Sequence, residues 1–177
     1  VVAETGEPGV VVDTLGIGGA RLTDLRRWDP ALWSEALRHR QPDLVTLAYG
    51  TNEATSIPFA TQTYERDARE VLTRLRQALP EVSCLFLSPF DVCRGANGGT
   101  PAGLLQAIAV QRRLAEEFGC GFWDGIAFMG GEGSMPRWAA ARPQLATGDG
   151  VHLTRLGYVY AGLAIGDALM RAYDAAP

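Results

Sequence analysis

The stretch DLVTLAYGTNEA, residues 43–54, contains the pattern that decides the fold. Its first seven residues form an apolar run of the kind found in buried strands. The run ends at once in the turn sequence Gly50-Thr51-Asn52-Glu53, and a helical pattern follows from about residue 58 to residue 79, where Pro80 ends it. A strand followed by a turn and a long helix is the βα unit of a parallel sheet.

The same alternation continues on both sides of this unit. Further strands are predicted at residues 10–12, 83–87 and 121–124, and further helices at residues 31–40, 101–118 and 155–173, with a short helix around Trp138. Strands that alternate with helices of ten or more residues predict an α/β fold with a doubly wound parallel sheet. In such sheets, ligands gather beyond the carboxyl ends of the strands.

Two segments carry specific expectations about burial. Val10-Val11-Val12 is a continuous β-branched run, which suits a strand that is buried on both faces. The last helix is amphipathic, and its apolar positions are expected to face inward: Leu156, Val159, Tyr160, Leu163 and Met170.

The composition is that of one globular domain. The chain has 177 residues, of which 47% are hydrophobic and 20% charged, and its net charge is −4. A negative chain gives no reason to expect nucleic acid or an anionic membrane as a partner. The arginine pairs 26–27 and 112–113 are interpreted as solvated helix faces. No apolar run reaches the roughly 20 residues that span a bilayer.

The cysteines and histidines predict no metal site and no cofactor. Cys84, Cys93 and Cys120 lack the spacing of a zinc site or a disulfide framework, although one bridge between two of the three remains open. Cys84 is expected in a buried strand. Two histidines and no clustered carboxylates make no metal-dependent site.

The segment Asp149-Gly150-Val151-His152 places an acid three residues before a base. If Thr154 caps the following helix, both side chains lie on the preceding loop, where Asp149 can orient the His152 imidazole and stabilise its protonated form. This is the His–carboxylate half of a serine-hydrolase triad. The alternative is an Asx turn beside an ordinary histidine.

Two further polar motifs follow predicted strands. Gly18-Gly19 lies in a glycine-rich turn after residues 10–12, and Asn52 lies in the turn after residues 43–49. Each alone is explained by turn chemistry. Together with the Asp149–His152 loop, however, they would share one rim of the sheet.

These three motifs, in this order, resemble the SGNH (GDSL-like) hydrolase superfamily over residues 10–173. The resemblance implies a flavodoxin-like three-layer α/β/α sandwich. It also implies that the Gly19 N–H and the Asn52 side chain are oxyanion donors, that His152 is the general base and that Asp149 is its orienting partner. Fixed neutral donors of this kind stabilise the negative charge that develops in acyl transfer.

More narrowly, three segments are similar to the peptidoglycan O-acetylesterase branch: GTNEA at 50–54, MGGEGSM at 129–135 with Trp138 just beyond, and DGVHLT at 149–154. This resemblance implies an acetylated cell-wall carbohydrate as substrate, and a periplasmic or secreted location. Met135 and Trp138 are expected either to line a substrate groove or to pack a core or lid.

The chain departs from the family at the nucleophile, because the Gly-Asp-Ser strand expected before Gly19 is absent. The serines present are Ser34, Ser56, Ser83, Ser88 and Ser134, and none lies in a nucleophile-elbow context. Some members of the branch carry a module inserted between the serine block and the glycine block. We therefore expect residues 1–9 to be the exit from such an insert, and residues 10–177 to be the C-terminal part of the catalytic domain, lacking its first strand.

Three functions are consistent with this reading. The first is a serine esterase whose nucleophile lies on an upstream segment of the same protein. The second is an SGNH-type O-acetyltransferase, which would need an acyl donor. The third is a glycan-binding domain that has lost its nucleophile.

Overall fold

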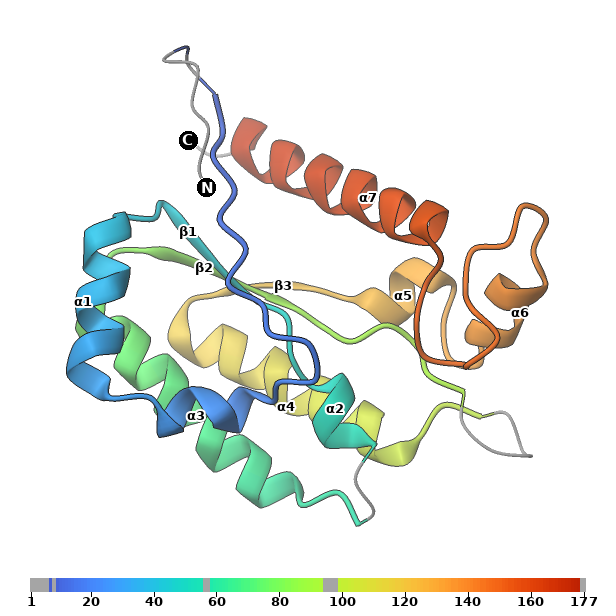
Figure 1. Cartoon of the computed structure of the whole chain (residues 1–177), viewed down its shortest axis with the longest axis horizontal. Coiled ribbons are helices and arrows are strands. Elements are labelled where there is room, and N and C mark those ends of the chain that lie inside the picture. Colours follow the sequence, from blue (N-terminus) through green and yellow to red (C-terminus); the bar gives the residue numbers. More distant parts are fainter. Residues whose placement is uncertain (1–6, 8, 56–57, 94–98, 176–177) are drawn as a thin grey trace.

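Three parallel strands form the sheet in the computed structural model, which describes residues 7, 9–55, 58–93 and 99–175. They are β1 (Leu44–Leu47), β2 (Ser83–Leu87) and β3 (Gly121–Trp123), and they lie in the order β1-β2-β3. Leu44 pairs with Ser83, and Leu85 with Gly121. The three strands confirm the sequence prediction for these segments, and the parallel order confirms the α/β class (Figure 1).

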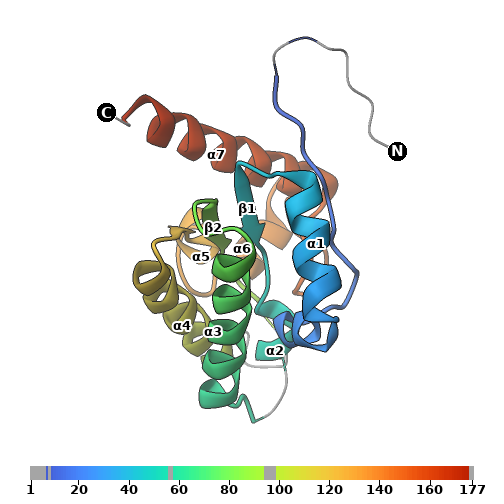
Figure 2. The ribbon, with the colours of Figure 1, turned by 90° about the vertical axis from the view of Figure 1, so that its left-hand side faces the viewer.

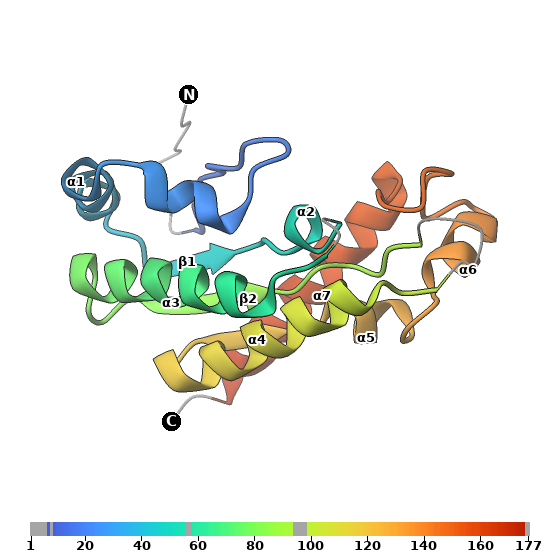
Figure 3. The ribbon, with the colours of Figure 1, turned by 90° about the horizontal axis from the view of Figure 1, so that it is seen from below.

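The helices also follow the predicted order. The long ones are α1 (Pro30–Arg40), α3 (Thr61–Ala78), α4 (Ala102–Phe118) and α7 (Arg155–Asp174), and the short ones are η1 (Leu22–Arg27), α2 (Thr51–Ala54), α5 (Gly125–Met129) and α6 (Met135–Ala140). Helices α3 and α4 lie side by side under the sheet, as seen from below in Figure 3, while α7 runs on the opposite side, at the top of Figure 2. The arrangement is the expected helix–sheet–helix sandwich.

The main core lies between the sheet and the α3–α4 pair. The predicted apolar stripe of α3 is buried there through Ala68, Val71 and Leu72, against Phe86 of β2 and Leu114 of α4. Residues of α3 at spacings of three and four share one face, so a single stripe is enough to bury the helix. This face of the sheet is therefore closed.

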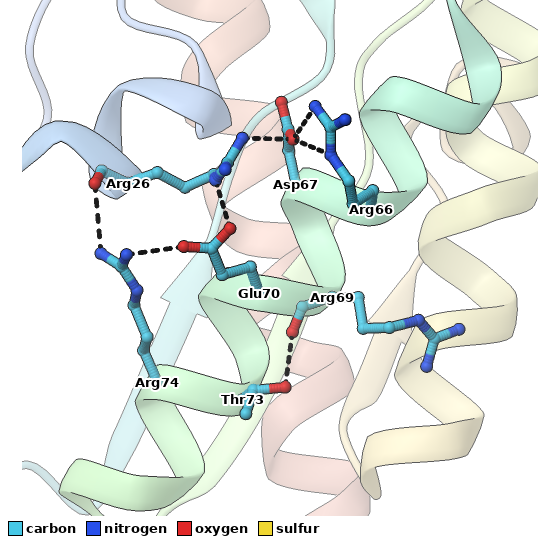
Figure 4. Close-up of polar contacts among 7 residues, drawn as sticks. All are labelled: Arg26, Arg66, Asp67, Arg69, Glu70, Thr73 and Arg74. Carbon is cyan, nitrogen blue, oxygen red and sulfur yellow. Dashed lines mark hydrogen bonds and ion pairs between the residues drawn. The ribbon is translucent and has the colours of Figure 1, made fainter.

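Charged side chains fasten η1 to the outside of α3. The Arg26 guanidinium binds the Asp67 carboxylate at 2.5 Å and the Glu70 carboxylate at 2.5 Å (Figure 4). Arg74 then joins the Glu70 carboxylate at 2.6 Å and the Arg26 carbonyl oxygen at 3.2 Å. The pair 26–27 was predicted as a solvated face. Arg27 is solvated, with its side chain 81% exposed, whereas Arg26 is 31% exposed and held by the two carboxylates of α3. The network fixes η1, which directly follows the Gly18–Gly19 turn.

A disulfide links the central strand β2 to the start of the edge strand β3. Cys84 in β2 is bonded to Cys120, the residue before β3, and Cys93 is free. The structure thus selects one of the pairings that the sequence left open. Cys84 is buried, as expected for its strand.

Val10-Val11-Val12 is not a strand, which corrects the prediction. The segment carries no strand assignment, and Val10 and Val12 are 91% and 77% exposed. Within the described residues, β1 pairs with β2 alone, so the valines do not pair with its other edge. A β-branched run forms a buried strand only where neighbouring strands and helices cover it. Here the segment is drawn in blue in Figure 1 as chain without strand or helix.

The inward face predicted for α7 is also wrong at four of its five positions, while the fifth, Leu156, is half-buried. Of this helix the structure buries Gly157 and Ala161, whereas Val159, Tyr160, Leu163 and Met170 are exposed. The apolar pattern is present, but the described residues do not supply a surface that covers it. None of the helices in the described ranges is long and apolar enough to cross a membrane.

Candidate active site

A side-chain amide ties the Gly18–Gly19 turn to α2, which follows the carboxyl end of β1. The Asn52 Nδ2 atom in α2 donates to the Ala20 carbonyl oxygen at 2.9 Å. Gly19 has a φ of +78°, which an L-residue rarely adopts. Gly50 has a φ of +116°, and a Cβ there would lie 2.9 Å from the Pro89 ring. Local backbone requirements thus account for both glycines.

The loop before α7 holds the predicted acid–base pair. His152 Nδ1 lies 2.6 Å from Asp149 Oδ2. The loop is closed by an antiparallel bridge between Ala146 and Leu153. Thr154 caps α7 by accepting a hydrogen bond from the Gly157 N–H at 3.2 Å, as predicted. The geometry combines the Asx turn with the acid–base pair, which the sequence posed as alternatives.

The Asp149 carboxylate collects several hydrogen bonds. Its Oδ1 accepts from the backbone N–H groups of His152 at 3.0 Å and Val151 at 2.8 Å, and from the Thr147 hydroxyl at 2.6 Å. These donors, the His152 N–H first, lower the pKa of Asp149 well below its usual range. Asp149 is therefore ionised at neutral pH and faces the imidazole as an anion.

Three of the predicted residues line one open pocket of about 220 Å³. They are Gly19, Asn52 and His152, and Asp149 lies behind His152 on its Nδ1 side. Because Nδ1 is engaged by Asp149, Nε2 is the ring nitrogen left for a ligand in the pocket. A base and two neutral donors around one space can accept a proton and stabilise an oxyanion.

The pocket contains residues that sequence reasoning missed. Its remaining lining residues are Thr51, Thr55, Phe90, Val151 and Tyr158. Phe90 and Tyr158 also contact each other, with ring centroids 6.3 Å apart. The position of Phe90 just after β2 was a usable signal, because that edge of the sheet gathers ligands. Tyr158 lies in the first turn of α7, and the apolar pattern of that helix gives no signal for it.

None of the serines in the described residues lines this pocket. Ser34 lies in α1, where its hydroxyl donates to the Pro30 carbonyl oxygen, and Ser83 begins β2. Ser88 is buried and accepts a hydrogen bond from the Gly125 N–H at 2.9 Å. Ser134 is buried at the start of α6, and Ser56 lies outside the described residues.

Residues of the segment 129–138 pack against one another in the interior. Met135 is fully buried, and the Trp138 indole donates to the Met129 carbonyl oxygen at 3.0 Å while packing against Phe128. Of the alternatives for Met135 and Trp138, the structure thus favours the core role. Across the described ranges, no group of three or more His, Cys, Asp or Glu side chains is placed to hold a metal ion.

Comparison with known proteins supports a hydrolase fold. The model of the GDSL-like lipase/acylhydrolase family matches residues 1–160. No curated protein matches the chain closely in sequence. Among solved structures, a peptidoglycan O-acetylesterase is 31% identical with a TM-score of 0.84, and the match covers 92% of this chain but 46% of that chain. This chain thus spans less than half the length of that relative.

More distant structures share the fold. An acetyl-xylooligosaccharide esterase mutant from Geobacillus is 23% identical with a TM-score of 0.63, covering 89% of this chain and 71% of that one. A structure named as a GDSL-like lipase, from Parabacteroides merdae, is 22% identical with a TM-score of 0.59. The match covers 78% of this chain and 63% of that one.

Proposed function

The chain belongs to the GDSL-like lipase/acylhydrolase family of the SGNH superfamily, and from that membership we propose that it is the C-terminal part of a serine esterase. The enzyme hydrolyses small acyl esters, acetyl in particular, on carbohydrate such as cell-wall glycan. The observation that carries the proposal is the pocket that Gly19, Asn52 and His152 line together, with Asp149 2.6 Å behind the imidazole.

Each residue has a chemical role in this proposal. His152 Nε2 takes the proton from the attacking hydroxyl and later delivers it to the leaving alcohol. Asp149 holds the ring through Nδ1 and stabilises the imidazolium. The Gly19 N–H and the second N–H of the Asn52 amide donate to the oxyanion. Asn52 keeps one N–H for this purpose because its other one is used on Ala20.

The nucleophilic serine belongs to a strand upstream of this chain. Support comes from two observations within the described residues: the open edge of β1, and the exposed Val10-Val11-Val12 segment, which pairs with no strand. The exposed apolar side chains of α7 would cover such a strand from above. A strand in this position would point its carboxyl end toward the rim that holds His152.

The proposed substrate class is taken from the names of similar structures. A peptidoglycan O-acetylesterase and an acetyl-xylooligosaccharide esterase are both named for acetylated carbohydrate. A small open pocket suits a short acyl group. Cell-wall glycan lies outside the cytoplasm, so the proposal includes a periplasmic or secreted location. The Cys84–Cys120 disulfide supports that location because structural disulfides persist in oxidising compartments.

The proposal is tested by labelling the longest natural form of the protein with a fluorophosphonate serine probe and mapping the labelled peptide. A label upstream of Val1, lost when His152 is replaced by alanine, is the expected result. A label on Ser56 or Ser88 would place the nucleophile within this chain and contradict the upstream strand. No label from the intact protein would favour a glycan-binding domain, and transfer exceeding hydrolysis would favour an O-acetyltransferase.

A further inference from the structure

Glu53 is a buried carboxylate whose two oxygens both accept hydrogen bonds from backbone N–H groups. It is 7% exposed. Its Oε1 accepts from the Leu22 N–H at 2.6 Å, and its Oε2 accepts from the Gly50 N–H at 3.1 Å. The first contact spans 31 residues of chain, so it is a tertiary contact as well as the local cap of α2.

The two N–H groups belong to the two segments that carry the oxyanion donors. Leu22 follows Gly19 by three residues and begins η1, while Gly50 precedes Asn52 by two residues and caps α2. The Asn52–Ala20 hydrogen bond is a second link between the same segments. The separation of Gly19 from Asn52 is therefore set by contacts that converge on one helical turn.

We propose that Glu53 is a positioning residue, a clamp that holds the Gly19 N–H and the Asn52 amide at the spacing an oxyanion needs. This inference rests on the proposed esterase function. Glu53 acts through the two loops and not by contact with substrate, since its carboxylate is turned toward backbone in the interior. Oxyanion donors act only when held close to their productive geometry, which a mobile pair of loops cannot supply.

The chemistry of the contact favours a carboxylate. Leu22 and Gly50 are buried, so each of their N–H groups needs an acceptor. A carboxylate offers two acceptor oxygens and no donor, whereas glutamine offers one of each. Burial raises the pKa of Glu53, and the backbone hydrogen bonds oppose that rise. Such an ionisable group costs more to bury than a neutral side chain, which indicates a specific use.

The discriminating variant is Glu53→Gln, which keeps the shape and turns one acceptor into a donor. The matched control is Asp91→Asn, the same chemical change at a fully buried carboxylate that accepts from the Thr100 hydroxyl at 2.6 Å and the Met135 N–H at 2.8 Å. Both variants are made in the longest natural form of the protein. The measurements are amide hydrogen exchange and the kinetics of p-nitrophenyl acetate hydrolysis.

In Glu53→Gln we expect exchange at the Leu22 or Gly50 amide to accelerate about 10-fold or more, because a buried donor loses its acceptor. We expect kcat to fall about 10- to 100-fold, since about 1 Å of misplacement can cost the upper figure. KM should stay within about 3-fold, because oxyanion donors act in the transition state. Asp91→Asn should lower Tm without changing kcat or exchange at Leu22 and Gly50.

If hydrogen exchange at the Leu22 and Gly50 amides is unchanged in Glu53→Gln, Glu53 is not a clamp, whether or not the enzyme is active. Faster exchange with unchanged kcat overturns the positioning role in an active enzyme. A wild-type protein without esterase activity instead overturns the proposed function, while exchange still reports on the clamp. If Glu53→Gln fails to fold, Glu53→Asp keeps both acceptors on a shorter stem and should lower kcat at constant KM.

Discussion

At the scale of single residues, Asp149 does two jobs with two oxygens. Its Oδ1 closes the loop by accepting from backbone N–H groups and the Thr147 hydroxyl, and its Oδ2 faces the imidazole of His152. The loop and the acid–base pair therefore depend on the same ionised group. The two jobs can be separated experimentally, because one affects stability and the other affects catalysis.

Replacing Asp149 by asparagine should lower kcat strongly, up to the roughly 10⁴-fold loss that the same change causes in a serine-protease triad. It should also lower Tm. The folded-state pKa of Asp149 is depressed, so its contribution to stability is present above the unfolded value of about 3.9 and is lost as pH falls toward the folded value.

Thermal melts from pH 8 down to pH 3 check the second part of this prediction. The difference in Tm between wild type and Asp149→Asn should stay constant down to about pH 4 and narrow below it. The control is Asp167→Asn, an exposed carboxylate paired with Arg171 on α7, which should leave kcat unchanged. A difference that narrows already near neutral pH would contradict the assignment.

Asn52 tests the oxyanion site at a second residue. Asn52→Ala should lower kcat about 10²- to 10³-fold with little change in KM, because the amide donor is used in the transition state. Steady-state kinetics with p-nitrophenyl acetate provide the measurement. A rise in KM at constant kcat would instead make Asn52 a ground-state binding residue.

At the scale of elements, the loop before α7 owes its shape to one glycine. Gly150 has a φ of +72°, and a Cβ on it would lie 2.0 Å from the Cys93 carbonyl oxygen. Its own carbonyl oxygen accepts a hydrogen bond from the Cys93 N–H at 2.8 Å. The acid–base loop is thus pressed against the segment after β2.

Gly150→Ala should destabilise the protein by about 2 kcal/mol or more and lower kcat, because either the backbone or Cys93 must move. Gly148→Ala is the matched control in the same loop, since a Cβ there meets nothing within 4 Å. It should change stability by less than about 0.5 kcal/mol. Urea unfolding and kcat measure both, and equal effects of the two variants would refute the steric argument.

The disulfide between β2 and the start of β3 is the other element-scale feature. Removing it by the double change Cys84→Ala and Cys120→Ala should cost about 2 to 4 kcal/mol, since it closes a loop of 36 residues. Cys93→Ala removes the free thiol and serves as the control. Urea unfolding of both variants tests this, and a neutral double variant would show that the bridge contributes little.

At the scale of the whole molecule, one side of the sheet is closed and the other is open. The side under α3 and α4 holds the main core, whereas α7 leaves Val159, Leu163 and Met170 in contact with solvent. Exposed apolar side chains and an unpaired strand edge both favour association with further chain.

Residues 1–177 alone should therefore unfold over a broad range and bind a hydrophobic dye, whereas the chain joined to its upstream segment should melt cooperatively at a higher temperature. The missing strand would pair with β1 and cover the exposed apolar side chains of α7. This supplies the burial that cooperative unfolding requires. Calorimetry of the two proteins makes the comparison. A sharp melt of residues 1–177 alone would count against the upstream strand.

The sequence by itself determined the order of elements and most of their bounds. Periodicity, the Thr154 cap and Pro80 are local signals, and the structure confirms the strands at β1, β2 and β3 and the helices α1, α3, α4 and α7. The motifs around Gly19, Asn52 and His152 were also found from sequence. The strand-end argument holds for Asn52, which follows β1, but not for Gly19, which follows a segment that forms no strand.

Only the tertiary structure decided which apolar runs are buried and which polar groups meet. Val10-Val11-Val12 and α7 have the right local pattern, yet burial depends on a neighbour that local pattern does not contain. The same holds for the Cys84–Cys120 pairing, for Arg26 on α3, and for Glu53, whose local role as a cap hides its contact with Leu22. Such contacts join residues far apart in the chain, so their energy is set by packing and not by local sequence.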